Sequence, residues 1–188
     1  MSLDLTPFHL ETPRLWVRPV VESDLPALME VNGDDHVTRF LPYPTWRSMD
    51  DAHAWFKRIV GMQDSASAMQ LVAVDKASGA AIATSLLFQF EQKSARAELG
   101  YVLGRAHWGK GLMHEALSAI LDHAFGPMGV RRLEAHVDPR NEASCALAQR
   151  LGFVREGLLR ERWVDKDVPT DIEVYGLLRR EWRRPGKE

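Results

Sequence analysis

The chain has 188 residues, of which 45% are hydrophobic and 27% are charged, values that are typical of a globular protein. Its formal net charge is −2, which argues against a nucleic-acid-binding protein, since such a protein usually carries a domain-wide basic surface. A lone cysteine and the lack of a long apolar run exclude an internal disulfide framework and argue against a membrane helix. We therefore expect one domain over residues 1–188. The N-terminus lacks the basic start and apolar stretch of a secretion signal, so we expect a cytoplasmic location.

The first part of the chain predicts one strand and two helices. Alternating apolar and polar residues predict a strand over 14–20. In the sequence ESDLP, Ser23 or Asp24 can cap a helix that has Pro26 in its first turn, and this helix is expected to end at Asn32-Gly33. A second helix is expected to begin at Ser48, because Asp51 three residues later completes a capping-box pattern.

The rest of the chain predicts six more strands and two more helices. The strands are expected at 70–75, 80–90, 96–104, 130–138, 153–164 and 171–179. One helix is expected to follow a glycine-rich segment near position 110, and the other lies between Asn141 and Gly152. Strand runs separated by single helices predict a layered α/β or α+β structure with a mixed sheet covered by helices.

The most informative local pattern is the sequence WGKGLM at 108–113, between a predicted strand and a predicted helix. Two glycines let the backbone turn sharply and approach a ligand closely. The free N–H groups and the dipole of the helix start suit a diphosphate, and Lys110 could add a positive charge. A dinucleotide fingerprint fails because His114 stands where its third glycine belongs, although Glu134 lies roughly twenty residues on, and no P-loop string is present. A helix start without any ligand remains an alternative.

A second pattern lies at the start of the following predicted helix. Asn141 opens this helix, and Ser144 follows three residues later, so both side chains belong to neighbouring parts of one helical face. A simpler interpretation is that Asn141 only caps the helix and that Ser144 is an ordinary first-turn residue. The spacing leaves both interpretations open.

Together these segments resemble the GNAT superfamily of acetyl-CoA-dependent N-acetyltransferases, and its branch of Rim-type ribosomal-protein N-terminal acetyltransferases most closely. The resemblance covers nearly the whole chain, through TPRLWVRPVVESDLPALM, AELGYVLGRAHWGKGLMHEAL, NEASCALAQRLGFVREG and DIEVYGLLRREW. It implies the GNAT fold, with a mixed, mostly antiparallel central sheet of about seven strands flanked by about four helices. It also implies acetyl-CoA as co-substrate, no metal, and two strands that splay apart to admit acetyl-CoA.

The resemblance assigns the acetyl-CoA pyrophosphate to the glycine-rich segment, which we call the glycine loop (residues 108–113). The strand before the loop would pair with the pantetheine amides, and Asn141 would contact the pantetheine arm. Ser144 would lie near the thiol and is a candidate to protonate the leaving thiolate. The predicted acetyl-CoA-binding residues are Tyr101, Val102, Leu103, Trp108, Gly109, Lys110, Gly111, Leu112, Met113, Asn141 and Ser144.

Acetyl transfer needs a neutral amine and a stabilised tetrahedral oxyanion. Glu98 is the candidate general base, because it stands on the strand that leads into the site and matches a glutamate often found there in the family. The alternative for Glu98 is an ion pair with Arg96, two residues away on the same strand face. Ser144 and Tyr101 are the candidate acids, and the alternative for Tyr101 is a place in the core.

The acceptor is predicted from the chemistry of amines. An α-amine titrates near ~7.8 and a lysine amine near ~10.4, so deprotonating an N-terminus at neutral pH costs roughly 3.5 kcal/mol less. We therefore predict transfer to a protein N-terminal α-amine by direct attack within a ternary complex. The alternatives are a small amine such as an aminoglycoside or a polyamine, and an acyl-CoA-binding module without catalysis.

The acceptor cleft is expected to lie among the first two helices, the loop at 41–46 and the turn at 165–170. None of these segments carries a recognisable specificity code. A homodimer is expected only because similar proteins often form one, and no membrane or direct nucleic-acid partner is expected.

Overall fold

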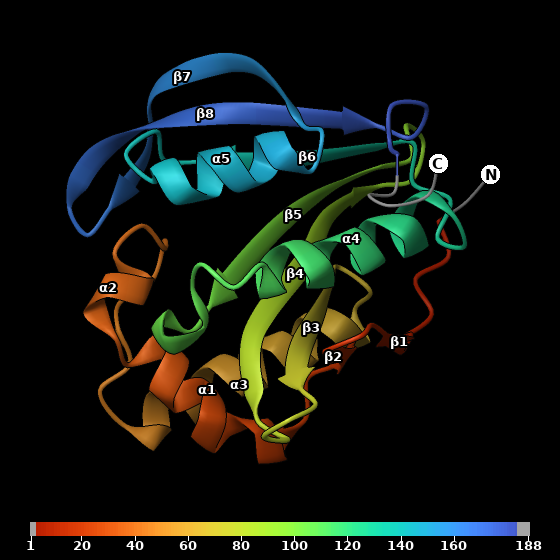
Figure 1. Cartoon of the computed structure of the whole chain (residues 1–188). Helices are drawn as coiled ribbons and strands as arrows, with labels where there is room; N and C mark the ends of the chain where they lie inside the picture. Colours follow the sequence, from red (N-terminus) through yellow and green to blue (C-terminus); the bar gives the residue numbers. More distant parts are fainter. Residues whose placement is uncertain (1–2, 184–188) are drawn as a thin grey trace.

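The computed structural model describes residues 3–183, and in this range the chain forms one eight-stranded sheet with helices on both faces (Figure 1). The order of the strands in the sheet is β1-β2-β3-β4-β5-β6-β8-β7. All neighbouring strands are antiparallel except β5 and β6, which run parallel. The predicted mixed, mostly antiparallel sheet is confirmed. The strands are β1 (Leu10–Glu11), β2 (Leu15–Pro19), β3 (Ala68–Asp75), β4 (Ala81–Glu91), β5 (Arg96–Leu103), β6 (Arg132–Val137), β7 (Val154–Asp165) and β8 (Val168–Leu178).

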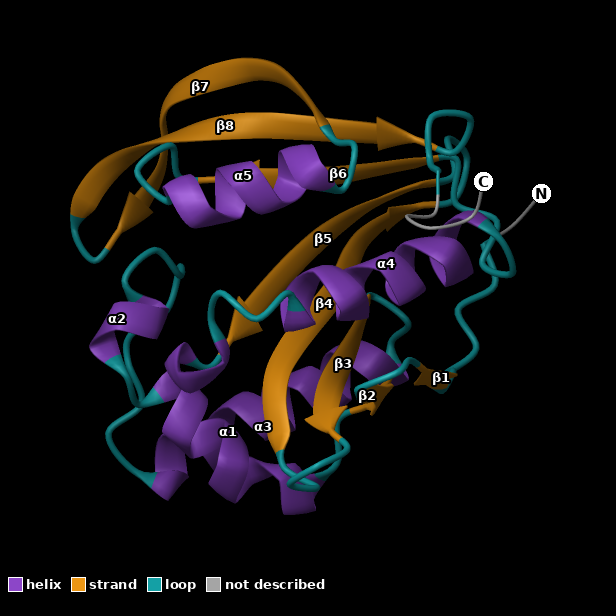
Figure 2. Ribbon diagram, in the orientation of Figure 1, coloured by secondary structure: helices purple, strands orange, loops and turns teal. Residues whose placement is uncertain are grey.

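Helices cover the two faces of the sheet in separate layers. Figure 2 shows α4 and α5 on the near face, while α1 and α3 pack behind β2, β3 and β4. The helices in the described range are α1 (Leu25–Asn32), α2 (Asp35–Thr38), α3 (Met49–Asp64), α4 (Leu112–Phe125) and α5 (Glu142–Arg150), with short 3-10 turns at Glu22–Asp24 and Arg105–His107. No helix in this range is both long and apolar enough to cross a bilayer.

The alternation of side chains along β3 explains why both faces are covered. Leu71 and Ala73 point into the core beneath α4, whereas Val72 and Val74 point into the core beneath α1 and α3. All four side chains are buried, and burying a Val or Leu side chain contributes about 1.5–3 kcal/mol. A strand with apolar residues on both sides must lie between two layers.

The structure differs from the sequence prediction in its smallest elements. It contains an eighth strand, β1, of two residues and an additional single-turn helix, α2, both too short to show a hydrophobic period. The turn predicted at 165–170 is also tighter, because β7 continues to Asp165 and β8 begins at Val168. Lys166 and Asp167 make the turn with φ angles of +49° and +66°, the geometry that joins two twisted antiparallel strands.

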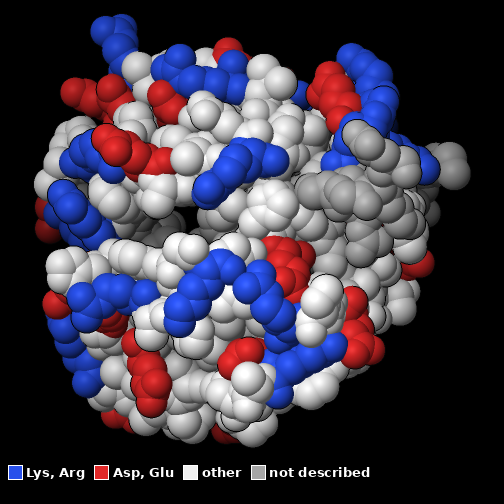
Figure 3. All heavy atoms as spheres, in the orientation of Figure 1, with Lys and Arg blue, Asp and Glu red and all other residues white. Residues whose placement is uncertain are grey.

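One break in the sheet determines where a ligand can enter. β5 and β6 pair only between Arg96–Glu98 and Arg132–Glu134, and beyond these residues the two strands diverge (Figure 2). The predicted splay of two strands is therefore present between β5 and β6. We call the space between the diverging strands the gap, and Figure 3 shows the molecule hollowed there, with Lys and Arg side chains on both rims.

Candidate active site

The glycine loop has the backbone conformation that its sequence predicts. Gly109 and Gly111 both have φ angles of +72°, in the left-handed region that glycine adopts without strain. Gly111 is the N-cap of α4, whose first N–H groups have no partner within the helix. Leu112 and Met113 are buried in the core, so only their backbones can face a ligand. A Cβ placed on Gly109 would meet no atom within 4 Å, so the loop borders open space, as a diphosphate site requires.

The polar side chains of the glycine loop fix its shape. The Lys110 ammonium donates to the Ala106 carbonyl at 2.8 Å, and the Trp108 indole N–H donates to the Leu103 carbonyl at 2.8 Å. Both side chains therefore tie the loop to the preceding segment. Lys110, the candidate source of an added positive charge, thus also holds the loop in place.

Sequence reasoning missed the arginine that holds this loop from outside. The Arg14 guanidinium donates to the Lys110 carbonyl at 2.9 Å and pairs with Glu115 at 2.6 Å. Thr12 Oγ1 also donates to the Glu115 carboxylate at 2.6 Å. These contacts attach the segment before β2 to the first turn of α4. Arg14 lies far from the loop in sequence and so gives no local signal of this contact. Glu115 does give one, because an acidic residue in the first turn of a helix is a recognisable pattern.

The end of β5 presents backbone groups to the gap. The Gly104 N–H donates to the Ile82 carbonyl of β4 at 2.9 Å. Successive residues of a strand point their backbone N–H and C=O groups to opposite sides. The N–H groups of Leu103 and Tyr101 therefore point away from β4 and into the gap. The backbone of Val102 turns toward β4, so its N–H and C=O do not line the gap. The Leu103 carbonyl already accepts the indole bond described above, so the Leu103 N–H and the Tyr101 N–H and carbonyl are the backbone groups here that can still bind a ligand.

The structure brings Tyr101 and Ser144 together. Their hydroxyl oxygens lie 2.8 Å apart, and the Tyr101 hydroxyl also lies 3.2 Å from the Ser144 carbonyl. Burial raises the pKa of Tyr101 to about 12. The Asn141 side-chain carbonyl accepts the Ser144 N–H at 3.2 Å and caps α5, as the simpler interpretation of this motif predicted.

Glu98 lies where β5 and β6 separate. Its side chain is buried, and burial together with the negative charge of Glu134 raises its pKa to about 7. Arg96 pairs with Glu134 at 2.6 Å, so the alternative ion pair between Arg96 and Glu98 is wrong. Instead, Glu98 Oε1 lies 3.3 Å from Nδ1 of His136 on β6.

Glu98 and Tyr101 project from opposite faces of β5. They are three residues apart, and side chains alternate along a strand. Tyr101 packs with the core on the face of α4 and α5, and its hydroxyl reaches Ser144 on α5. A titratable carboxylate thus lies on one side of the gap and a hydroxyl pair on the other. This arrangement can take a proton from a nucleophile on one face and serve a leaving group on the other.

Two of the segments predicted to form the acceptor cleft, the turn between β7 and β8 and the loop at 41–46, both contact Thr38 of α2. The Lys166 ammonium donates to the Thr38 carbonyl at 2.8 Å. The loop at 41–46 follows α2 directly, and its Thr45 hydroxyl lies 2.6 Å from the Thr38 hydroxyl. These contacts join the turn after β7 to α2 and to the loop that follows α2.

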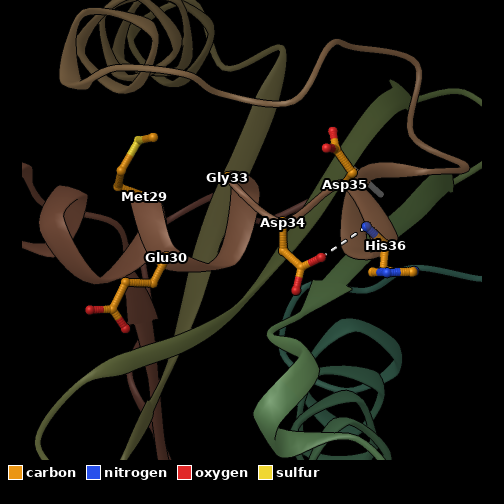
Figure 4. Close-up of a pocket in the computed structure, with 6 residues that line it drawn as sticks. All are labelled: Met29, Glu30, Gly33, Asp34, Asp35 and His36. Carbon is orange, nitrogen blue, oxygen red and sulfur yellow. Dashed lines mark hydrogen bonds between the residues drawn. The ribbon is translucent and has the colours of Figure 1, made fainter.

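A depression lies at the junction of α1 and α2, beside the segments just described, since the Thr45 hydroxyl donates to the Asp35 carboxylate (Figure 4). Its volume is about 580 Å³, and it is lined by Met29, Glu30, Gly33, Asp34, Asp35 and His36. The Asp34 carboxylate accepts the His36 N–H at 2.9 Å and pairs with Arg105 at 2.7 Å, which fixes the start of α2. None of the predicted site residues lines this depression. Within residues 3–183 no cluster of three or more His, Cys, Asp or Glu side chains could hold a metal.

Comparison with known proteins identifies the family. Residues 14–154 match the acetyltransferase (GNAT) domain. The chain belongs to the GNAT family. Acetyl-CoA is the acetyl donor of this family, and the protein is an N-acetyltransferase.

Individual relatives and structures agree with this assignment. The chain is 32% identical over 173 residues to the uncharacterized N-acetyltransferase p20 of Bacillus licheniformis, covering 92% of this chain and 97% of the relative. Over 89 residues it is 40% identical to the [ribosomal protein uS5]-alanine N-acetyltransferase of Escherichia coli, covering 47% of this chain and 45% of that one. The crystal structure of a probable acetyltransferase of the GNAT family from Chromobacterium violaceum superposes with a TM-score of 0.87 at 30% identity, covering 97% and 92% of the two chains.

Proposed function

We propose that this GNAT protein acetylates the α-amine of a protein N-terminus, by direct attack in a ternary complex formed on a single domain of residues 1–188. The observation that carries the proposal is the placement of Glu98 on one face of β5 and of the Tyr101–Ser144 pair on the other, beside the gap. The similarity to a ribosomal-protein alanine N-acetyltransferase supports the acceptor class. A cytoplasmic location and a homodimer stay predictions from the sequence.

The pKa of Glu98 favours an α-amine as the acceptor. A base with a pKa of about 7 lies roughly one unit below an α-amine, which titrates near ~7.8. Taking a proton from that amine costs roughly 1 kcal/mol, whereas a lysine amine near ~10.4 would cost roughly 4.6 kcal/mol. Glu98 is therefore suited to an N-terminus and poorly suited to a lysine side chain.

Acetyl-CoA would supply the acetyl group: the amide C–N bond forms, the thioester C–S bond breaks, and CoA leaves as a thiol. The backbone of the glycine loop would hold its diphosphate, and the backbone of Tyr101 would hold the pantetheine arm, which Asn141 is also proposed to contact. A backbone N–H of β5 in the gap, such as that of Tyr101, would stabilise the developing oxyanion.

The Tyr101–Ser144 pair would serve the leaving sulfur mainly through hydrogen bonding. A thiol titrates near ~8.5, about 3.5 units below the pKa of about 12 that burial gives Tyr101. Full proton transfer from Tyr101 would thus be uphill by roughly 5 kcal/mol. We expect the Ser144 hydroxyl, held by Tyr101, to donate to the sulfur while water supplies the proton.

An acetyl-transfer assay over a panel of amines tests the proposal. The panel contains peptides with different N-terminal residues, the same peptides blocked at the N-terminus and carrying a free lysine, an aminoglycoside and a polyamine. We expect acetylation of free peptide N-termini. Product from the small amines alone would make the protein a small-molecule acetyltransferase. Acetyl-CoA binding without product from any amine would make it a binding module, and either result contradicts the proposal.

A further inference from the structure

His136 lies beside the proposed base at the point where the sheet opens. The last register pair between β5 and β6 is Glu98 with Glu134, and His136 follows two residues later on the diverging strand. Its Nδ1 lies 3.3 Å from Glu98 Oε1. Among the described residues, no Lys or Arg side chain lies within ion-pair distance of the Glu98 carboxylate, so the His136 imidazole is its nearest basic group.

The charged groups around this pair come from three strands and are mostly engaged elsewhere. On β5, Arg96 pairs with Glu134 at 2.6 Å, and on β6 Arg132 pairs with the same carboxylate at 2.7 Å. The negative charge of Glu134 is therefore compensated by two guanidinium groups. From β7, the positive charge of Arg162 acts on both Glu98 and His136. His136 alone is close enough to orient the Glu98 carboxylate.

We propose that His136 is a positioning residue for Glu98: when the acceptor is bound, the imidazole donates its Nδ1–H to Glu98 Oε1 and so leaves the second carboxylate oxygen of Glu98 turned toward the acceptor amine. The inference rests on the proposed function, since it assigns His136 to the same reaction. Glu98 takes one proton from the acceptor ammonium and later releases it to water, while His136 keeps its own proton throughout.

The surroundings of the imidazole fit this role. Burial lowers the pKa of His136, so the ring is neutral near pH 7 and can donate a hydrogen bond without placing a full positive charge beside the base. A full charge there would lower the pKa of Glu98 and weaken it as a base. The Trp163 ring packs edge-on against the imidazole, with centroids 6.2 Å apart, and restrains its orientation.

The first test compares His136→Phe, which removes the donor, with His136→Asn, whose amide N–H takes the place of Nδ1–H. The pH profile of kcat is measured with two acceptors whose amines have different pKa values, so that a limb common to both belongs to the enzyme. We expect His136→Phe to lower kcat about tenfold and to shift the enzyme's acidic limb upward by about one pH unit, with the KM for acetyl-CoA unchanged. His136→Asn should restore the limb and most of kcat. An acidic limb at the wild-type position in both variants would overturn the inference. So would an equal loss of kcat in both variants together with weaker acetyl-CoA binding.

A second test needs no acetyl transfer and uses the wild-type fold. The imidazole signals of His136 are followed by NMR as the pH is raised, in the wild type and in Glu98→Gln. We expect an inflection near pH 7 in the wild type, which Glu98→Gln removes. Identical titrations in the two proteins would overturn the inference even if acetyl transfer is observed. An inactive wild type with the coupling intact would instead refute the proposed function, so the two failures are distinguishable.

Discussion

The two sides of the gap between β5 and β6 are built in different ways. On the side of acetyl-CoA, the glycine loop and the start of α4 form one continuous stretch of sequence, and their backbone groups would bind the ligand. On the acceptor side, Glu98, His136 and Trp163 come from β5, β6 and β7, and the proposed roles belong to their side chains. The acetyl-CoA side depends on the backbone conformation of the glycine loop. The acceptor side depends on how β5, β6 and β7 are placed relative to one another.

This difference means that the two sides can be disturbed separately. The acetyl-CoA side is held by the buried residues of α4 and by the contacts of Arg14 and Glu115. The acceptor side is partly built on β7, an edge strand whose pairing with β8 is irregular between Leu159 and Trp163. A change on one side should alter acetyl-CoA affinity, and a change on the other should alter turnover and its pH dependence.

The largest effect is expected on the acceptor side, from Glu98→Gln. Removing a general base costs typically about 10²- to 10⁴-fold in rate, so kcat should fall at least about a hundredfold. Acetyl-CoA affinity, measured by calorimetry, should stay unchanged because Glu98 faces away from the glycine loop. Unchanged turnover in this variant would remove Glu98 from the mechanism.

The pH profile of the wild type is a second test of the acceptor side. Glu98 accepts a proton only as a carboxylate, and its pKa is raised to about 7. Activity should therefore be full above this pH and fall about tenfold for each unit below it. The limb is measured as kcat with two acceptor amines of different pKa. An enzyme limb near 4.5, the ordinary pKa of a glutamate, would show that burial does not raise the pKa of Glu98.

On the acetyl-CoA side, Gly109→Ala tests whether backbone conformation carries the binding. A Cβ has space at this position, so the cost comes from the φ angle of +72° and amounts to about 1–2 kcal/mol. We expect acetyl-CoA affinity to fall about tenfold, with little change of kcat at saturation. Gly61→Ala is the matched control, since Gly61 lies in α3 with open space around it and an ordinary φ. The control should stabilise the protein slightly and leave affinity unchanged.

The smallest effects are expected from Tyr101→Phe and Ser144→Ala, which change the hydroxyl pair beside the gap. Each removes one hydroxyl of the pair, and each should lower kcat about fivefold to tenfold through a lost hydrogen bond. Acetyl-CoA affinity should change less than kcat in both variants, as measured by calorimetry. If affinity falls and kcat does not, the hydroxyl pair serves binding only.

The same comparison explains which features could be predicted from the sequence. The glycine loop, the main strands and the main helices follow from local patterns, such as the glycines at 109 and 111 and the capping box at Ser48. Ser144 could be placed near the gap only through the family resemblance. Its bond to Tyr101 joins residues 43 positions apart and carries no local signal.

The acceptor side was harder to predict for a physical reason. Arg96 and Glu98 share a strand face, and the sequence offered them as an ion pair. In the structure Arg96 instead pairs with Glu134, because the parallel neighbour β6 brings that carboxylate alongside. The contact of His136 with Glu98 depends on the same strand pairing. Parallel neighbours distant in sequence cannot be assigned from the spacing of residues along one strand.

The most direct test of the account is a competition within one molecule. A short peptide with a free N-terminal alanine and one internal lysine is incubated with acetyl-CoA and the purified protein, and the site of acetylation is located by tandem mass spectrometry. We predict a single acetyl group on the α-amine, formed at least about a hundredfold more slowly by Glu98→Gln. Acetylation of the lysine first, or an equal rate in the variant, would contradict it.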